Sequence, residues 1–111
     1  MIPRKYRATR IDIENAIKAG STIDSSILYA KVSKKDVEKT GFAIIVPKKV
    51  EATSVGRHLI KRRISDVIEK NLSKISPIFK KTIVFLVKKQ GKGAEYEEIK
   101  KGVEEILGKI L

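Results

Sequence analysis

The sequence predicts a small α+β sandwich in which helices pack on one sheet, with the elements in the order α-β-β-α-β-α. Three observations lead to this prediction. The chain has 111 residues, which is enough for one domain with a single core. Hydrophobic residues make up 41% of it, as in globular proteins. Apolar positions alternate between helical spacing and short strand-like runs. The sequence contains no repeat, low-complexity segment or linker, so we expect one domain over residues 1–111.

The first half of the chain is expected to form one helix and two strands. A short helix is predicted over 9–18, with Thr9 as its N-cap. Residues 23–32 are rich in β-branched and apolar side chains and predict a strand. The polar residues 33–39 are expected to form a hairpin connection to a second strand over 42–46. The near-continuous apolarity of this second strand predicts a central position in the sheet.

The second half is expected to form a helix, a strand and a final helix. Ser54 is the predicted N-cap of a helix that reaches residue 72. The apolar positions of this helix share one face, and they are Ile60, Ile64, Val67, Ile68 and Leu72. A third strand is predicted over 81–87 and is broken by the glycines of residues 90–93. The final helix is predicted over 95–111, and its core face contains Tyr96, Ile99, Val103, Ile106, Leu107 and Ile110.

The charge of the chain is the strongest indication of its partner. Lys and Arg number 25 against 13 Asp and Glu, which gives a net charge of +12. A small domain with this imbalance repels itself unless a polyanion compensates, and nucleic acid is the expected polyanion. An anionic membrane surface is an alternative, but the chain lacks a long basic amphipathic helix with bulky aromatic residues. Lysine enrichment of the thermophile kind is a second alternative, although that bias usually adds Glu as well.

Composition also excludes several classes of protein. The absence of cysteine excludes a disulfide framework, a thiolate zinc site and a cysteine nucleophile. No apolar run approaches the roughly 18 residues that span a bilayer. The basic N-terminus is not followed by the apolar stretch of a signal peptide. We therefore expect a cytoplasmic protein that has no membrane partner.

The residues do not predict a catalytic site in the chain itself, nor a cofactor bound by it. His58 is the only histidine and has no second histidine with which to hold a metal, so a role in hydrogen bonding or stacking is favoured. Glu95, Glu97 and Glu98 cluster, but acids in a first helical turn stabilise the helix dipole by a few tenths of a kcal/mol each. The segment Gly91–Gly93 is too short for a phosphate-binding loop. The chain is predicted to bind rather than to catalyse.

A dense basic cluster lies at the front of the second predicted helix. Arg57 and Lys61 are four residues apart, as are His58 and Arg62, so two adjacent rows of the helix present donors together with Arg63. Cationic side chains beside the N–H groups of a helix start suit phosphate oxygens. A helix-turn-helix fits poorly, because the basic helix lies between two strands. The aromatic strand motif of common RNA-binding sheets is missing.

Taken in order, these features resemble the bacterial ribonuclease P protein subunit. The second helix of that family carries approximately Arg-Asn-x-x-Lys-Arg, after a strand that ends in Ser-Lys-Lys. This chain has Arg57-His58-Leu59-Ile60-Lys61-Arg62-Arg63 after Pro47-Lys48-Lys49. The start, Pro3-Arg4-Lys5-Tyr6-Arg7, and the close, Tyr96-Glu97-Glu98-Ile99-Lys100-Lys101, are also similar to the family. The resemblance covers nearly the whole chain in order, length and charge.

The resemblance implies a fold, a function and partners. The fold contains a left-handed βαβ crossover, against the usual right-handed rule. The enzyme is a ribonucleoprotein endoribonuclease whose RNA subunit uses Mg²⁺ to hydrolyse the phosphodiester at the 5′ end of mature tRNA. The protein assists by binding ribonuclease P RNA and the 5′ leader of precursor tRNA, and is not catalytic without the RNA. A non-catalytic RNA-binding module, such as a ribosomal or RNA-assembly protein, is the alternative function.

The resemblance also implies two groups of RNA-binding residues. The first group binds the catalytic RNA and contains Arg57, His58, Lys61, Arg62 and Arg63. The second group lines a leader cleft between the first helix and the sheet and contains Ile13, Ile17, Tyr29, Lys48 and Lys49. Ile13 and Ile17 stand where the family commonly has aromatic rings. Their spacing suits an ordinary place in the core equally well, so both interpretations stay open.

Overall fold

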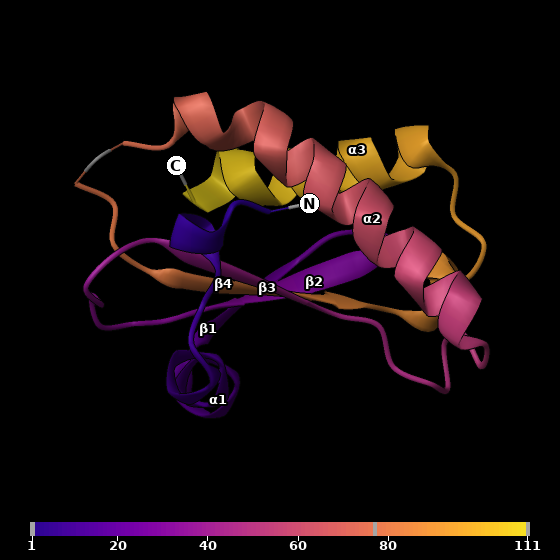
Figure 1. The fold of residues 1–111 in the computed structure, drawn as a ribbon, viewed down its shortest axis with the longest axis horizontal. Coiled ribbons are helices and arrows are strands. Elements are labelled where there is room, and N and C mark those ends of the chain that lie inside the picture. The colour runs from indigo at the N-terminus through magenta and orange to yellow at the C-terminus, as the bar shows by residue number, and fades with distance from the viewer. Residues whose placement is uncertain (1, 77, 111) are drawn as a thin grey trace.

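Helices lie on both faces of a four-stranded mixed sheet, with α2 and α3 on one face and α1 on the other (Figure 1). The computed structural model describes residues 2–76 and 78–110. The elements are α1 (Arg10–Ala19), β1 (Ser21–Asp24), β2 (Leu28–Val32), β3 (Gly41–Ile45), α2 (Ser54–Asn71), β4 (Thr82–Val87) and α3 (Tyr96–Ile110). The predicted α+β sandwich is confirmed, and so are the three predicted helices.

The strand predicted over 23–32 is in fact two strands, so that part of the prediction is wrong. β1 and β2 pair antiparallel as a hairpin, with Ser21 opposite Val32 and Asp24 opposite Tyr29. The chain reverses between them, where the N–H of Ser25 donates to the carbonyl oxygen of Leu28 at 3.0 Å. Asp24, Ser25 and Ser26, at the end of β1 and in the turn, are polar residues that favour turns, so a local signal was present in the sequence and was missed.

The predicted central position of the strand over 42–46 is also wrong, because β4 lies between β2 and β3 and leaves β3 at the edge. The order is β1-β2-β4-β3, so residues 33–39 cross from β2 to β3 past β4 and do not form a hairpin. β3 stays apolar at the edge because other segments cover it. The ring of Phe42 is 2% exposed, and the N–H of Ala8 donates to the carbonyl oxygen of Phe42 at 3.0 Å along the outer side of the strand.

A βαβ unit joins β3 to β4 through α2. The two strands are adjacent and parallel, with Phe42 opposite Ile83 and Ile45 opposite Leu86. This is the element in which the resemblance implies an unusual crossover. The βαβ unit is confirmed, and the left-handedness of its crossover stays a prediction.

The main core lies between the sheet and the pair of helices α2 and α3. Alternate residues of β2 and β4 point into it, namely Leu28, Ala30, Val32, Ile83, Phe85 and Val87. The predicted helix faces meet them, with Ile60, Ile64, Val67 and Ile68 buried from α2 and Ile99, Val103, Ile106 and Leu107 buried from α3. The rings of Phe42 and Phe85 stack at 6.5 Å between centroids. Leu72, Tyr96 and Ile110 are partly buried at its margin.

A second, smaller contact joins α1 to the other face of the sheet. Ala16 of α1 and Val84 of β4 are both fully buried, and neither belongs to the main core. Thr9 is the N-cap of α1, as predicted, and its hydroxyl oxygen accepts from the N–H of Asp12 at 3.2 Å. α1 is the helix that lies on this face (Figure 1), and Tyr29 and Leu86 on the same face are only half-buried.

Candidate nucleic-acid interface

The loop before α2 fixes the direction of the basic helix. Thr53, and not the predicted Ser54, is the N-cap, and its hydroxyl oxygen accepts from the N–H of Gly56 at 3.0 Å. The carboxylate of Glu51 accepts from the N–H and the hydroxyl of Thr53 at 3.1 and 3.0 Å. The bond from the Thr53 N–H, and then the one from its hydroxyl, hold the pKa of Glu51 below its ordinary value of 4.5. Serine caps at least as readily as threonine, so residue type did not identify Thr53, and it is the extended backbone of Thr53 that makes it the cap.

Two of the predicted RNA-binding arginines also hold the backbone. Arg57 donates from Nη1 to the carbonyl oxygens of Glu51 and Ala52 at 3.0 and 2.8 Å. Arg63 donates from Nη1 to the carbonyl oxygen of Ala94 at 2.7 Å. Both side chains are half-buried. Arg57 therefore fastens the loop before α2 and Arg63 the loop before α3, while the other N–H groups of each guanidinium are left for a ligand.

The other three predicted residues of this helix are exposed and unpartnered. The side chains of His58, Lys61 and Arg62 make no hydrogen bond or ion pair with the described part of the chain. They are free to turn toward phosphate oxygens. We call the five residues the basic helix start, and they are Arg57, His58, Lys61, Arg62 and Arg63.

We predict that Arg62→Ala and Arg63→Ala differ in their effect on stability, although each removes one charge. Arg63→Ala leaves the carbonyl of Ala94, a residue that is 4% exposed, without its donor. An unsatisfied buried acceptor costs about 1–3 kcal/mol of unfolding free energy. Arg62→Ala, at an exposed site, should change stability by less than about 0.5 kcal/mol. Urea unfolding of the two variants checks this, and equal losses would contradict the assigned contact.

A surface hollow of about 690 Å³ lies beside the basic helix start. Its lining residues come from α2 and from the first residue of α3, and they are His58, Leu59, Arg62, Arg63, Asp66 and Tyr96. Leu59 is 45% exposed there, and Val55, one turn earlier, is 80% exposed. The surface therefore combines cations with apolar side chains, which suits both phosphate and base contacts.

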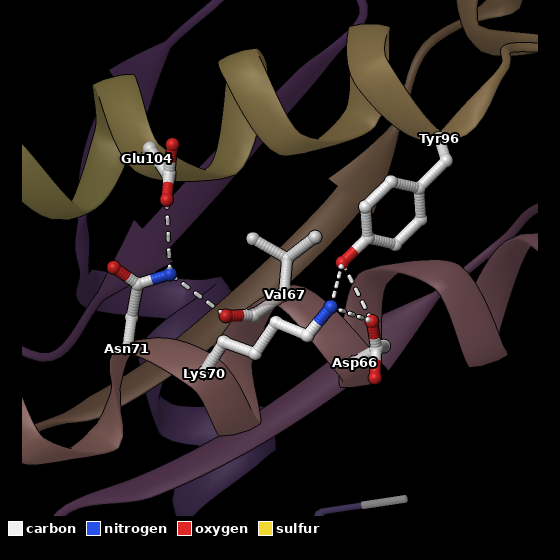
Figure 2. Close-up of polar contacts among 6 residues, drawn as sticks. All are labelled: Asp66, Val67, Lys70, Asn71, Tyr96 and Glu104. Carbon is white, nitrogen blue, oxygen red and sulfur yellow. Dashed lines mark hydrogen bonds and ion pairs between the residues drawn. The ribbon is translucent and has the colours of Figure 1, made fainter.

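A three-residue contact that sequence reasoning missed ties α2 to α3 beside this hollow (Figure 2). The hydroxyl of Tyr96 donates to Oδ2 of Asp66 at 2.6 Å, and Nζ of Lys70 donates to the Tyr96 oxygen at 3.1 Å. Lys70 and Asp66 also form an ion pair at 3.1 Å. Nearby, Nδ2 of the buried Asn71 donates to the Val67 carbonyl and to Glu104. The i,i+4 spacing of Asp66 and Lys70 was visible in the sequence, but their contact with Tyr96 was not.

This contact predicts a pH dependence of stability. The hydrogen bond from Tyr96, and then the one from Lys70, lower the pKa of Asp66 from its ordinary value of 3.8. A lowered folded-state pKa contributes stability above the ordinary value, and that stability is lost as the pH falls through the folded-state pKa. Thermal unfolding should therefore show a steeper loss of Tm below about pH 4 for the wild type than for Asp66→Asn. If Tm fell equally with pH in the wild type and in Asp66→Asn, the assigned role of Asp66 would be contradicted.

The second predicted group lies on the open face of the sheet. Tyr29, Leu86 and Ile45 are neighbours across β2, β4 and β3, and all three are half-buried. They alternate with side chains of the main core, so they point to the face that carries α1. We call these three residues the open row. Sequence reasoning identified Tyr29 and missed Leu86 and Ile45.

The remaining predicted residues divide between α1 and the turn after β3. On α1, Ile13 is half-buried and Ile17 is 39% exposed, and neither belongs to the main core. Lys48 and Lys49 are exposed in the turn that directly follows β3. This turn lies next to the open row, because Ile45 is the last residue of β3. Since α2 begins a few residues later, the basic helix start lies at this end as well.

Residues 2–76 and 78–110 show neither a metal-binding cluster nor a membrane-spanning helix. No three His, Asp or Glu residues in these ranges are grouped so that they could hold a metal ion. No helix in them is long and apolar enough to cross a membrane.

Comparison with known proteins gives one family and one fold. A sequence model of the family described as Ribonuclease P matches residues 2–111. The ribonuclease P protein of Staphylococcus aureus has the same fold, with a TM-score of 0.79 and 21% identity, and the match covers 95% of this chain and 94% of that one. The Thermotoga maritima protein matches with a TM-score of 0.80 and 17% identity, over 95% of this chain and 97% of that one.

A third solved structure is a Staphylococcus aureus ribonuclease P protein mutant described as defective in mRNA degradation activity. It matches with a TM-score of 0.80 and 21% identity, over 95% of this chain and 87% of that one. No curated protein matches the chain in sequence. The family match spans almost every residue, including the basic helix start and the open row, and the fold agrees with it. The chain therefore belongs to the ribonuclease P family, whose members serve in the maturation of the 5′ end of tRNA.

Proposed function

We propose that the chain binds ribonuclease P RNA through the basic helix start and binds the 5′ leader of precursor tRNA along the open row. The observation that carries this proposal is that both surfaces lie at one end of the sheet. His58, Lys61 and Arg62 are exposed and unpartnered there, and Lys48 and Lys49 separate them from the open row. A protein with this arrangement can hold a catalytic RNA and its substrate side by side.

The open row and α1 would hold a single-stranded leader. Tyr29 offers a ring on which a base can stack, and stacking of this kind is worth roughly 1–3 kcal/mol per base. Ile13 and Ile17 add apolar contact but no π-face, so Tyr29 would carry the larger share of the stacking. Lys48 and Lys49 would hold the leader phosphates.

The protein would contribute positioning and charge, and the RNA would contribute the chemistry. The Mg²⁺ ions of the reaction would be held by the RNA, and no residue of this chain is assigned to them. Cations of the basic helix start would offset repulsion between RNA phosphates, so the protein should help most when Mg²⁺ is scarce. One similar structure is a Staphylococcus aureus mutant described as defective in mRNA degradation activity. The protein without RNA is therefore a necessary control in any cleavage assay.

Binding measurements separate this function from that of a general RNA-binding or ribosomal protein. The purified protein is titrated, at one salt concentration, with bacterial ribonuclease P RNA and with a ribosomal RNA fragment of equal length. We expect tighter binding to ribonuclease P RNA. We also expect the assembled complex to bind precursor tRNA more tightly than mature tRNA. Equal affinity for both RNAs, with no preference for the leader, would contradict the proposal.

A further inference from the structure

A second hollow, of about 330 Å³, lies at the other end of the molecule. It is lined by residues 5–6, 38–40, 75–76 and 79–80, and the residues that matter most are Lys5, Tyr6, Glu38, Lys39, Phe79 and Lys80. Ile75 and Ser76, just after the C-terminal end of α2, form part of its wall. The hollow therefore lies beyond the C-terminal end of α2, a helix of 18 residues and about 27 Å, whereas the basic helix start lies toward the N-terminal end of that helix.

Two of the few aromatic rings of the chain meet at this hollow. The chain has only three Phe and three Tyr. Phe42 and Phe85 are buried in the main core, and Tyr96 is hydrogen-bonded to Asp66. In contrast, Tyr6 and Phe79 are half-buried, with one side packed against the core and the other lining the hollow.

The backbone under both rings is fixed. The N–H of Tyr6 donates to the Pro3 carbonyl at 2.9 Å, and the N–H of Phe79 donates to the Ser76 carbonyl at 3.0 Å. The carbonyl of Phe79 also accepts from the hydroxyl of Thr40. The fold therefore sets the backbone positions from which both rings reach the hollow.

Unpaired cations surround the rings. Lys5, Lys39 and Lys80 are exposed, and none of them forms an ion pair with the described residues, whereas Lys81 next door pairs with Asp36. Glu38 is the one acid among the lining residues. Nζ of Lys5 lies 5.4 Å from the centroid of the Tyr6 ring. The hollow thus combines the aromatic side chains of Tyr6 and Phe79 with an excess of positive charge.

We propose that this hollow is a second RNA-binding site, which takes one unstacked base of a single-stranded segment against Tyr6 and Phe79. Its flanking phosphates contact Lys5, Lys39 and Lys80. Aromatic rings beside cations are the usual means of binding single-stranded RNA, and the volume is at the lower limit of ligand pockets, which suits a single nucleotide. An acidic peptide would use the lysines but would leave the rings without a partner. The inference rests on the proposed RNA-binding function and adds a contact near the opposite end of α2 from the basic helix start.

A local fluorescent reporter tests this site. The chain has no tryptophan, so Phe79→Trp introduces the only indole and keeps an aromatic ring in the hollow. Titration with an oligouridylate of about six nucleotides should quench its fluorescence, because a base stacks on the indole. Phe79→Leu has no indole, so it is titrated with the same oligouridylate carrying a fluorescent label. Its affinity at this site should fall by about 5- to 150-fold. Unchanged indole fluorescence at saturating RNA would overturn the proposal, and so would quenching by oligoglutamate but not by RNA.

Charge variants in the Phe79→Trp background supply the matched control. Lys39→Gln with Lys80→Gln should weaken quenching and lower the slope of log affinity against log salt by about 1.4, or 0.7 per phosphate. Lys100→Gln with Lys101→Gln removes the same charge from exposed positions of α3 and should change neither. Equal effects of the two pairs would overturn the site. Normal binding of ribonuclease P RNA with no change in the indole fluorescence refutes this inference alone. A responsive indole with no preference for ribonuclease P RNA or for precursor tRNA refutes the proposed function.

Discussion

Replacing Lys61 and Arg62 together by alanine is expected to weaken binding to bacterial ribonuclease P RNA by at least about tenfold, since hydrogen bonds to charged groups contribute about 1.5–3 kcal/mol each. Both side chains are exposed and have no partner in the described part of the protein, so their charge is available to the RNA. Each lost phosphate contact should lower the slope of log affinity against log salt by roughly 0.7–0.9. The measurement is a binding titration at several salt concentrations.

Lys34→Ala with Lys35→Ala is the matched control, because it also removes two exposed positive charges. These lysines lie in the connection between β2 and β3 and should contribute only to the general field of the protein. Thermal unfolding should show that neither double variant is destabilised. If the two pairs weaken binding equally, affinity follows net charge and the basic helix start is not a specific site. Arg57→Ala is less informative, because its loss also releases the carbonyls of Glu51 and Ala52.

Ile17→Phe is expected to tighten binding of precursor tRNA relative to mature tRNA by about fivefold or more, since one base–aromatic stack is worth roughly 1–3 kcal/mol. Ile17 is 39% exposed and lies outside the main core, so a larger ring has room beside the open sheet face. The melting temperature should not fall. The measurement compares Kd values for the two tRNAs with the reconstituted ribonucleoprotein.

Ile11→Phe is the control on the same helix. Ile11 is 70% exposed and lines a different hollow, together with Asp36 and Val37, so an added ring there should leave the preference for the leader unchanged. The alternative is that Ile17 acts as a core residue. In that case Ile17→Phe would destabilise the fold by roughly 1–3 kcal/mol through overpacking, and the preference for precursor tRNA would not improve.

The helices could be predicted from the sequence because their signals are local. Apolar residues at helical spacing identified the buried faces of α2 and α3, and Thr9 marked the start of α1. The strands were harder, because pairing depends on residues far apart in the chain. Nothing near β3 indicates that β4 lies between it and β2. The polar residues Asp24, Ser25 and Ser26 did mark the turn between β1 and β2, and sequence reasoning missed this local signal.

The candidate site divides in the same way. The basic helix start follows from one turn of helix, so spacing alone brought Arg57 and Lys61 together. The open row depends on the register of three strands, so Leu86 and Ile45 could not be placed beside Tyr29 in advance. The bonds from Arg63 to Ala94 and from Tyr96 to Asp66 span about thirty residues of sequence, and no periodic pattern indicates such contacts.

Cleavage of precursor tRNA by a bacterial ribonuclease P RNA, with and without this protein, tests the central claim most directly. The rate is measured from low to high Mg²⁺, and the protein alone is incubated with precursor tRNA and with an mRNA. We predict that the protein accelerates removal of the leader, that the effect is largest at low Mg²⁺, and that the protein alone cleaves neither RNA. Failure to accelerate cleavage at any Mg²⁺ concentration would contradict the account. Cleavage by the protein alone, surviving rigorous removal of contaminating nucleases, would contradict it as well.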